Sequence, residues 1–452
     1  MGCRLVVHLF ALLSTTRVTV ARVLLYRYSG VWYRYKSRSG MILFQTGRNL
    51  HSISSSSSSR AALSLGMPRV AFVAGGTGVV GRYLLTRLSR KGSPWDVVYA
   101  GGRRKLDITP EVGGCPIVSV EVDLTSPEDC AEKVGHLNVT HFFFAAYAGS
   151  VSVEANLDLL RHVMHVLAAS PSLKHVHLVQ GTKWYGYGVL PGKFKTPAKE
   201  SDPRCMPPLF YYNQQDLVVE LQRASPCTTW TWSACRPHAV VGFSVGSAMN
   251  LTMVIAVYAS ICRELGLNLD FPGTEANYRA VYQMTDSALL AKGIEWMATT
   301  DACANEPFNI TNGDFIRWEH VWPVIAHFFG VPLGIVRTTK LSETMRTPDK
   351  AALWKTMVDK YKLQDHTWDR LVNWDFADFV WHNGCDVMSS TIKCRQYGFH
   401  EYIDTEEMLL EVFGKMMDTG VIPHFAANDG ATGVAMGVAA AKRRKLAHGS
   451  KS

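Results

Sequence analysis

The first 67 residues contain no aspartate or glutamate, and the first acidic side chain of the whole protein is Asp96. The same segment carries nine arginines and lysines, which equals the formal net charge of +9 of all 452 residues. The remainder of the chain is therefore electrically balanced. Composition gives no sign of a basic surface on a folded body, so we expect no nucleic-acid partner.

Long hydrophobic runs are also absent. No apolar stretch reaches the roughly 18 residues that a membrane-spanning helix needs, and the longest candidates are interrupted by Arg17, Arg22 and Arg27. We expect no stable membrane span. The ten cysteines form no Cys-x-x-Cys pair and no cluster with histidines. This scatter argues against a zinc site and is typical of reduced thiols in an intracellular compartment.

Composition divides the chain into segments. Residues 1–67 are rich in arginine and serine, include the serine run 54–59, and have the composition of an organellar transit peptide. The alternative is that Met67 is the real start, which leaves a cytoplasmic protein. Residues 426–452 are rich in glycine and alanine, carry the basic run 442–445 and are expected to form a flexible tail. The folded body is expected between these two segments.

Within the body, short apolar runs alternate with helical patterns. Strands are predicted at 69–74, 96–101, 117–122, 140–145, 175–180 and 229–236, and helices at 79–90, 153–168, about 215–223 and 249–265. Nearly continuous apolar strands separated by helices indicate a parallel sheet covered on both faces. We predict an α/β fold with a Rossmann-type doubly wound sheet over 68–243. A mostly helical substrate-binding region is predicted over 244–425, with strands that return to the core.

A glycine-rich loop lies between the first strand and the first helix of the body. It has the spacing Gly-x-x-Gly-x-x-Gly, in which Gly75 makes a tight turn, Gly78 lets the backbone approach a pyrophosphate and Gly81 allows close helix packing. Phosphates bind the free N–H groups at such a helix start. The predicted cofactor contacts in this loop are Gly75, Thr77, Gly78, Val79, Val80 and Gly81.

The second strand indicates which dinucleotide binds. It ends in Arg103 and Arg104, and no carboxylate follows before Asp107. A guanidinium offers a 2′-phosphate a bidentate pair, whereas a carboxylate would repel it. The sequence therefore predicts NADPH as the cofactor. Since ligands of such sheets bind at the carboxyl ends of the strands, further cofactor contacts are expected at Asp123, Leu124, Ala145, Tyr212, Pro237 and Val240.

Two later segments carry candidate chemistry. The strand at 175–180 runs into Gly181-Thr182-Lys183-Trp184-Tyr185-Gly186, and Phe210-Tyr211-Tyr212 opens a helix. Extended short-chain dehydrogenases/reductases carry a tyrosine at this helix with a lysine four residues later. The fourth residue after Tyr212 is Asp216, so the usual pair is missing.

At this point the sequence resembles one family, the progesterone 5β-reductase and iridoid synthase group of enone reductases, over residues 68–425. The resemblance rests on several stretches in the same order. They are the glycine loop with its arginine pair, Gly181–Tyr185, Phe210–Tyr212 with Asp216, Arg236-Pro237, Val241–Ser244, Met249–Leu251, Glu306–Asp314 and Trp318.

The resemblance implies a function and a catalytic pair. Such enzymes keep a lysine on the strand-end loop and a tyrosine on the helix, which points to Lys183 and Tyr212. Tyr212 is preferred over Tyr211 because Glu220 follows it eight residues on, as in the wider class. The implied reaction is hydride transfer from NADPH to the β-carbon of an α,β-unsaturated carbonyl compound that is small and apolar. No metal ion takes part.

The sequence also departs from the family. After Arg236-Pro237 the usual Gly-Asn is replaced by His238-Ala239, and Gln215 replaces the usual glutamate beside Asp216. His238 is either a group that titrates near neutral pH or a packed aromatic ring. Two other functions stay open: a carbonyl reductase or epimerase of the same fold, and an NADP(H)-sensing protein without chemistry. Whether the protein is a homodimer is left open as well.

Overall fold

The computed structural model describes residues 68–425, apart from 107, 150–151, 190–194, 206–208, 226–229 and 248, and also the backbone of 32–37 and 40–45. The chain divides into two units, Met1–Gly66 and Met67–Ser452. In the first unit, β1 (Trp32–Ser37) and β2 (Gly40–Gln45) form an antiparallel pair. The predictions for 426–452 lie outside the described residues, as do those for most of 1–67.

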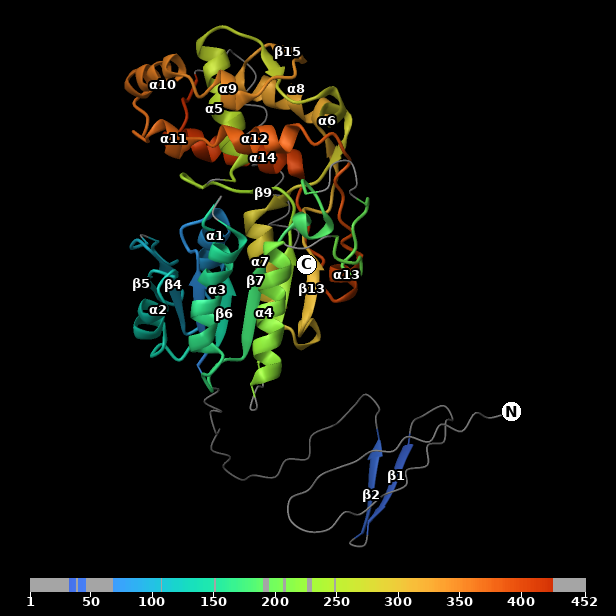
Figure 1. The fold of residues 1–452 in the computed structure, drawn as a ribbon. Coiled ribbons are helices and arrows are strands. Elements are labelled where there is room, and N and C mark those ends of the chain that lie inside the picture. The colour runs from blue at the N-terminus through green and yellow to red at the C-terminus, as the bar shows by residue number, and fades with distance from the viewer. Residues whose placement is uncertain are drawn as a thin grey trace, which may run out of the picture. The chain divides into compact units, whose positions relative to one another are not determined.

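The second unit is built on a parallel sheet of seven strands (Figure 1). From one edge to the other the strands are β13 (Glu306–Asn309), β8 (Thr231–Arg236), β7 (His175–Val179), β6 (His141–Phe144), β3 (Val70–Ala74), β4 (Val97–Gly102) and β5 (Ile117–Glu121). The chain runs outward from β3 through β4 to β5 and then returns to β6 on the other side of β3. The strand order thus reverses between β3 and β6, which is where sheets of this kind bind their ligands.

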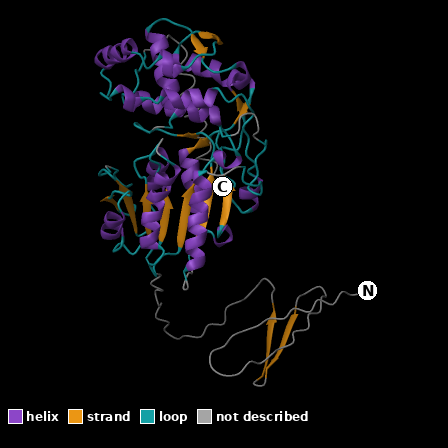
Figure 2. Ribbon diagram, in the orientation of Figure 1, coloured by secondary structure: helices purple, strands orange, loops and turns teal. Residues whose placement is uncertain are grey.

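Helices cover both faces of this sheet, as Figure 2 shows. One face carries α1 (Val79–Leu88) and α7 (Ser287–Thr299); the other carries α2 (Pro127–Val134), α3 (Val153–Leu167) and α4 (Phe210–Ala224). Strand β6 shows why both faces are needed. Phe142 and Phe144 are buried against α3 and its neighbours, whereas Phe143 is buried on the side of α1 and α7. Since side chains alternate between the faces of a strand, three consecutive phenylalanines require two apolar layers.

A helical lobe lies beyond the carboxyl ends of the strands (Figure 1). Its helices are α5 (Leu251–Glu264), α6 (Glu275–Arg279), α8 (Trp318–Phe329), α9 (Leu341–Thr344), α10 (Pro348–Tyr361), α11 (Trp368–Leu371), α12 (Trp374–Trp381) and α14 (Thr405–Asp418). Four fully buried tryptophans centre its core: Trp318, Trp322, Trp374 and Trp381. Burial of such large rings accounts for much of the lobe's stability. No helix in the described ranges is long and apolar enough to cross a membrane.

Short elements connect the lobe to the sheet. The turns η1 (Thr182–Tyr185) and η2 (Asp301–Cys303) follow β7 and α7, and α13 (Ile392–Gln396) packs beside β13. Three two-stranded pairs complete the fold: β9 (Val240–Val241) with β12 (Thr285–Asp286), β11 (Val281–Tyr282) with β14 (Ile316–Arg317), and β10 (Leu269–Phe271) with β15 (Leu333–Val336). The chain thus leaves the sheet after β8, builds part of the lobe, and returns through α7 and β13.

The predicted parallel sheet is confirmed. Six of its seven strands agree with the expected ranges to within two residues, and the seventh, β13, had no predicted range. The helices differ from expectation in detail. Helix α4 begins at Phe210, where its opening was expected, although the helical pattern was placed only at about 215–223; both Tyr211 and Tyr212 are helical. Helix α2 was not predicted, although Ser126 caps it and Pro127 occupies its first turn, which is a known signal for a helix start.

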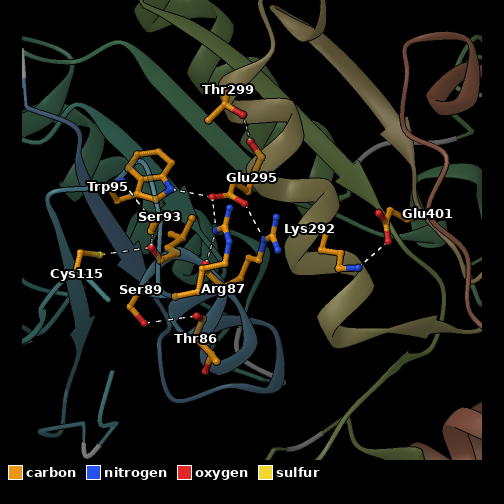
Figure 3. A network of polar contacts seen from close by, with 12 residues as sticks. Thr86, Arg87, Ser89, Ser93, Trp95, Cys115, Lys292, Glu295, Thr299 and Glu401 are labelled. Carbon is orange, nitrogen blue, oxygen red and sulfur yellow. Dashed lines mark hydrogen bonds and ion pairs between the residues drawn. The ribbon is translucent and has the colours of Figure 1, made fainter. Parts of the chain in front are cut away.

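The returning helix α7 is tied to α1 by a buried carboxylate (Figure 3). Glu295 accepts hydrogen bonds from Arg87 Nε at 2.7 Å, Arg90 Nη1 at 2.8 Å and Trp95 Nε1 at 3.1 Å. Its side chain is only 6% exposed. A carboxylate buried this deeply is tolerated because three donors face it. Residues that are about 200 positions apart in the sequence are thereby held together.

Replacing Glu295 by glutamine should destabilise the protein, because both arginines lose their ion-pair partner. We expect a loss of about 2–4 kcal/mol in the free energy of unfolding, measured by urea denaturation. Glu401→Gln is the matched control. Glu401 forms an ion pair with Lys292, which lies on α7 like Glu295, but both of these side chains are more than 40% exposed. Loss of this ion pair should therefore cost less than about 1 kcal/mol. Equal effects of the two changes would contradict a structural role for the buried carboxylate.

Candidate active site

The glycine loop lies where the strand order reverses. The backbone N–H groups of Gly75 and Gly76 donate to the carbonyl of Gly101 at the end of β4. Gly75 has φ +86°, and a Cβ there would lie 2.7 Å from the peptide of Ala145 at the end of β6. Only glycine fits such a close approach with a positive φ. The loop thus lies between the ends of β4 and β6. Gly75 and Ala145, which are both predicted to contact the cofactor, therefore lie next to each other.

Helix α1 starts from this loop without a side-chain cap. Gly78 is its N-cap residue, no side chain of the described residues bonds the first turn, and the first turn holds no acidic residue. The N–H groups of this turn are therefore free to bind phosphate, and the helix dipole favours negative charge there. A Cβ on Gly81 would overlap the carbonyl oxygen of Gly75, so Gly81 lets the helix pack against its own loop rather than against the sheet. The cradle fits a dinucleotide pyrophosphate.

The predicted 2′-phosphate side is formed by the ends of β4 and β5. Arg103 and Arg104 are exposed there, and Leu124 is buried nearby. Asp123 accepts hydrogen bonds from the N–H and hydroxyl groups of Thr125, which lower the pKa of its carboxyl group, with a smaller effect of Arg103. The carboxylate of Asp123 is thus already engaged, and both guanidinium groups are accessible. This arrangement fits a phosphorylated ribose.

Lys183 lies on η1, the turn that follows β7. Its side chain is half-buried, and burial lowers the pKa of the ammonium group from its usual value. In the described part of the chain no carboxylate pairs with it; its Nζ atom lies 5.0 Å from the centre of the Phe379 ring. The N–H of Thr182, beside Lys183, donates to the carbonyl of Pro237 at the end of β8. Lys183 and Pro237 therefore meet at the same edge of the sheet.

A buried arginine supports this turn. Arg236 is 1% exposed; its Nε donates to Gln180 Oε1 and its Nη1 to the hydroxyl of Tyr185, each at 3.1 Å. Its guanidinium lies 3.7 Å from the ring centre of Trp184. The hydroxyl of Tyr185 in turn donates to Asn309 Oδ1 on β13 at 2.7 Å. The residues on either side of Lys183 are thus fixed to three neighbouring strands.

The two adjacent tyrosines of α4 point in different directions. A Cβ on Gly181, next to the end of β7, would lie 3.3 Å from the hydroxyl oxygen of Tyr211. The Tyr211 phenol therefore reaches the strand end, beside the turn that carries Lys183. Burial raises the pKa of Tyr211, mainly by desolvation and further by the nearby Tyr147 and Cys235. Its hydroxyl stays protonated at neutral pH and can donate a hydrogen bond.

The hydroxyl of Tyr212 is occupied elsewhere. It donates to the carbonyl of Trp184 at 2.5 Å and accepts from the N–H of Cys205 at 2.8 Å. The side chain is 2% exposed, and its ring packs against Trp184. No hydrogen bond joins Tyr212 and Lys183 among the described residues. This geometry does not support the choice of Tyr212 over Tyr211 as the phenol at the site.

One turn of an α-helix takes 3.6 residues, so neighbouring side chains differ by about 100° in direction. The spacing from Tyr212 to Glu220 could not decide between the two tyrosines, because the lysine that anchors this spacing in the wider class is absent here. Tyr211 lies near Gly181 because of the way α4 packs against β7. The spacing of residues along the sequence does not predict this packing.

His238 is a packed ring. It is 4% exposed, its Nδ1 bonds the hydroxyl of Thr182 at 2.8 Å, and its ring contacts Tyr187 and Tyr282 edge-on. Burial lowers the pKa of His238 to about 3. The ring is therefore neutral near pH 7, which favours the packed aromatic ring over the alternative of a group that titrates there. Ala239, which follows it, has φ +38°, a conformation that costs a residue with a Cβ about 1 kcal/mol or more.

The remaining predicted contact also lies at this edge. Val240 begins β9, which pairs in parallel with β12, and the following carbonyl of Val241 accepts from the hydroxyl of Ser287 at the start of α7. The hydroxyl of Tyr83, on α1, accepts from the N–H of Phe243 at 3.1 Å. The segment after β8 is thus held against both helices that flank the glycine loop.

Comparison with known proteins places this chain in a family. Residues 112–423 match the family described as a PRISE-like Rossmann-fold domain. The chain belongs to that family. It is 32% identical over 375 residues to the (S)-8-oxocitronellyl enol synthase of Antirrhinum majus and 30% identical over 368 residues to the 3-oxo-Δ4,5-steroid 5β-reductase of Arabidopsis thaliana. Each alignment covers 78% of this chain and 93% of the relative.

Solved structures share the fold of this PRISE-like chain at low identity. The enzyme WbmG of Bordetella bronchiseptica in complex with NAD matches with a TM-score of 0.53 at 14% identity, over 80% of this chain and 100% of the other. The epimerase Mth375 of Methanothermobacter thermautotrophicus matches with a TM-score of 0.54 at 15% identity, over 78% and 93%. These likenesses confirm the Rossmann-type architecture and no more.

The buried state of His238 predicts a pH dependence of stability. In the folded protein the pKa is about 3, against 6.5 for a free imidazole, so below pH 6.5 the unfolded chain binds a proton that the folded chain refuses. Stability should therefore fall as the pH falls from 6.5, by about 1.4 kcal/mol per pH unit. The change His238→Asn keeps an acceptor near the Nδ1 position and cannot titrate.

Urea denaturation of both proteins at about pH 7.5 and about pH 5 measures the effect. His141 and His177, whose pKa values burial also lowers, remain in both proteins, so the difference between the slopes isolates His238. The variant should lose less stability on acidification than the parent. Identical slopes would mean that His238 is already solvated in the folded state.

Proposed function

We propose that this protein is an NADPH-dependent reductase that adds hydride to the β-carbon of a small, apolar α,β-unsaturated carbonyl compound. The observation that carries the proposal is the meeting of the Tyr211 phenol with the end of β7, beside the turn that bears Lys183. Both groups come from the edge of the sheet at which the glycine loop lies. The family relationship supports it, because relatives are named as an enol synthase and a steroid 5β-reductase.

The residues that would hold the cofactor are those at the strand ends. The glycine loop and the first turn of α1 would bind the pyrophosphate, Arg103 and Arg104 the 2′-phosphate, and the ends of β6 and β8 would flank the nicotinamide. When bound, NADPH supplies the hydride. The protein's own side chains then determine where charge can develop on the substrate.

Hydride addition to the β-carbon breaks the C=C π bond and moves its electron pair toward the carbonyl oxygen. A phenol and an ammonium directed at that oxygen stabilise the growing enolate more than the neutral carbonyl, which lowers the barrier. We assign these roles to Tyr211 and Lys183, in place of the Tyr212 expected from the sequence. The α-carbon then takes a proton from water. Tyr212 instead fixes the turn, through the carbonyl of Trp184.

The principal test compares the two tyrosines. In the full-length protein supplied with NADPH and a simple enone, Tyr211→Phe and Lys183→Met should each lower kcat by roughly a hundredfold or more, with NADPH affinity near normal. Tyr212→Phe should keep most of the activity, but lose about 1–3 kcal/mol of stability because the Trp184 carbonyl and the Cys205 N–H lose their partner. If Tyr212→Phe is inactive and Tyr211→Phe is not, our assignment is reversed.

Product analysis separates the alternatives. With NADPH deuterated at the transferred position, the proposal predicts a saturated ketone that carries deuterium at the β-carbon. An allylic alcohol would indicate a carbonyl reductase of the same fold. Binding of NADPH without turnover of any carbonyl compound would favour an NADP(H)-sensing protein.

The arginines at the end of β4 should set the cofactor preference. Arg103→Ala and Arg104→Ala should raise the KM for NADPH roughly tenfold to a hundredfold, since a charge-assisted hydrogen bond is worth about 1.5–3 kcal/mol. The KM for NADH, which lacks the 2′-phosphate, should hardly change and serves as the internal control. Equal effects on both cofactors would show that these side chains do not recognise the phosphate.

A further inference from the structure

The ammonium group of Lys183 is held by an aromatic ring of the helical lobe. Its Nζ atom lies 5.0 Å from the ring centre of Phe379 on α12. This is within the range of about 6 Å at which a ring face attracts a cation. Among the described residues no carboxylate forms an ion pair with Lys183, and its side chain is half-buried. Among the described residues, the face of the Phe379 ring is thus the group that interacts with the positive charge of Lys183.

Phe379 is itself firmly placed. Its neighbour Asp378 accepts hydrogen bonds from the N–H groups of Leu341 and Ser342, which joins α12 to the start of α9. The Phe379 ring packs edge-on against Tyr187, with centres 5.9 Å apart. Gly188, with φ +67°, provides the space for it, because a Cβ at that position would overlap the ring. The strand-end turn and the helical lobe are therefore shaped to fit each other at Phe379.

The contacts continue behind Lys183. Tyr187 packs on His238, and His238 bonds the hydroxyl of Thr182, the residue before Lys183. Aromatic contacts thus run from Phe379 to Tyr187 and His238, and a hydrogen bond leads back to the turn itself. The sheet therefore fixes the backbone of Lys183, and the helical lobe fixes its charged end.

We propose that Phe379 is a positioning residue for catalysis: its ring face holds the Lys183 ammonium, dry and charged, in the place where a substrate carbonyl oxygen arrives. The inference rests on the proposed function, because it gives Phe379 a role only through Lys183. Phe379 need not touch the substrate or the cofactor. It follows that the helical lobe, although remote from the cofactor loop, helps to determine the catalytic rate.

The pH dependence of activity gives a readout that a merely structural role would not change. Burial lowers the pKa of Lys183 and raises that of Tyr211, so Lys183 is the first of the two to lose its proton as the pH rises. The basic limb of the profile of kcat/KM should therefore report the Lys183 ammonium. Phe379→Leu keeps the apolar cover but removes the ring face, which should destabilise the ammonium and move this limb to lower pH.

The experiment uses the full-length protein and four variants, Phe379→Leu, Phe379→Tyr, Phe376→Leu and Lys183→Met, with NADPH and a simple enone. Phe379→Leu should lower kcat/KM roughly tenfold at neutral pH, as expected for loss of one cation–π contact, and Phe379→Tyr should restore both rate and pH profile. Phe376→Leu is the matched control. Phe376 lies one turn earlier on α12 and stacks on Phe379, with ring centres 6.4 Å apart, so its loss reports any general loosening of the helix.

The expected result is a lower rate and a shifted basic limb in Phe379→Leu alone. If Phe379→Leu and Phe376→Leu have the same profile, the positioning role of Phe379 is overturned, while an inactive Lys183→Met would leave the proposed function standing. If Lys183→Met is fully active, the catalytic role of Lys183 fails and this inference fails with it. Should Phe379→Leu not fold, Phe379→Met, which also lacks a ring, provides the same comparison.

Discussion

The candidate active-site edge of the sheet depends on one buried charge, the guanidinium of Arg236. Removing an arginine from water is costly unless its donors are satisfied, and here Gln180, Tyr185 and the ring of Trp184 all face it. These three residues belong to the end of β7 and the turn η1. The energetic need to satisfy Arg236 therefore fixes the conformation of the turn that presents Lys183. Through Tyr185 and Asn309 the same network reaches β13, which is the last of the seven strands of the main sheet along the sequence.

The candidate site brings together a stiff sheet edge and a separate helical lobe. The sheet carries the glycine loop and the turn of Lys183, helix α4 supplies Tyr211, and the lobe supplies the ring that faces the Lys183 ammonium. Glu295 holds helix α7 against α1. The segment that returns from the lobe to the sheet is therefore fixed to the helix that follows the glycine loop. The side chains that we propose act on one substrate oxygen atom are thus held by contacts between segments far apart in the sequence.

Much of this was predictable from the sequence. The sheet, the glycine loop and the family relationship follow from local patterns, since apolar strands, turn glycines and short motifs each have a direct physical signature. The orientation of the helical tyrosines has none, because a shift of one residue turns a side chain by about 100°. The hydrogen bond of His238 to Thr182 joins residues more than 50 positions apart, and the contact of Lys183 with the Phe379 ring joins residues nearly 200 positions apart. Hydrophobic periodicity along the sequence gives no information on such contacts.

In the proposed mechanism the Tyr211 hydroxyl and the Lys183 ammonium meet at one substrate oxygen. A crystal structure with NADP⁺ and an unreactive enone analogue tests this most directly. We expect both groups within about 3 Å of the carbonyl oxygen, with the hydroxyl of Tyr212 still bonded to the Trp184 carbonyl. A carbonyl oxygen bonded by Tyr212, or one that neither Tyr211 nor Lys183 approaches, would contradict it.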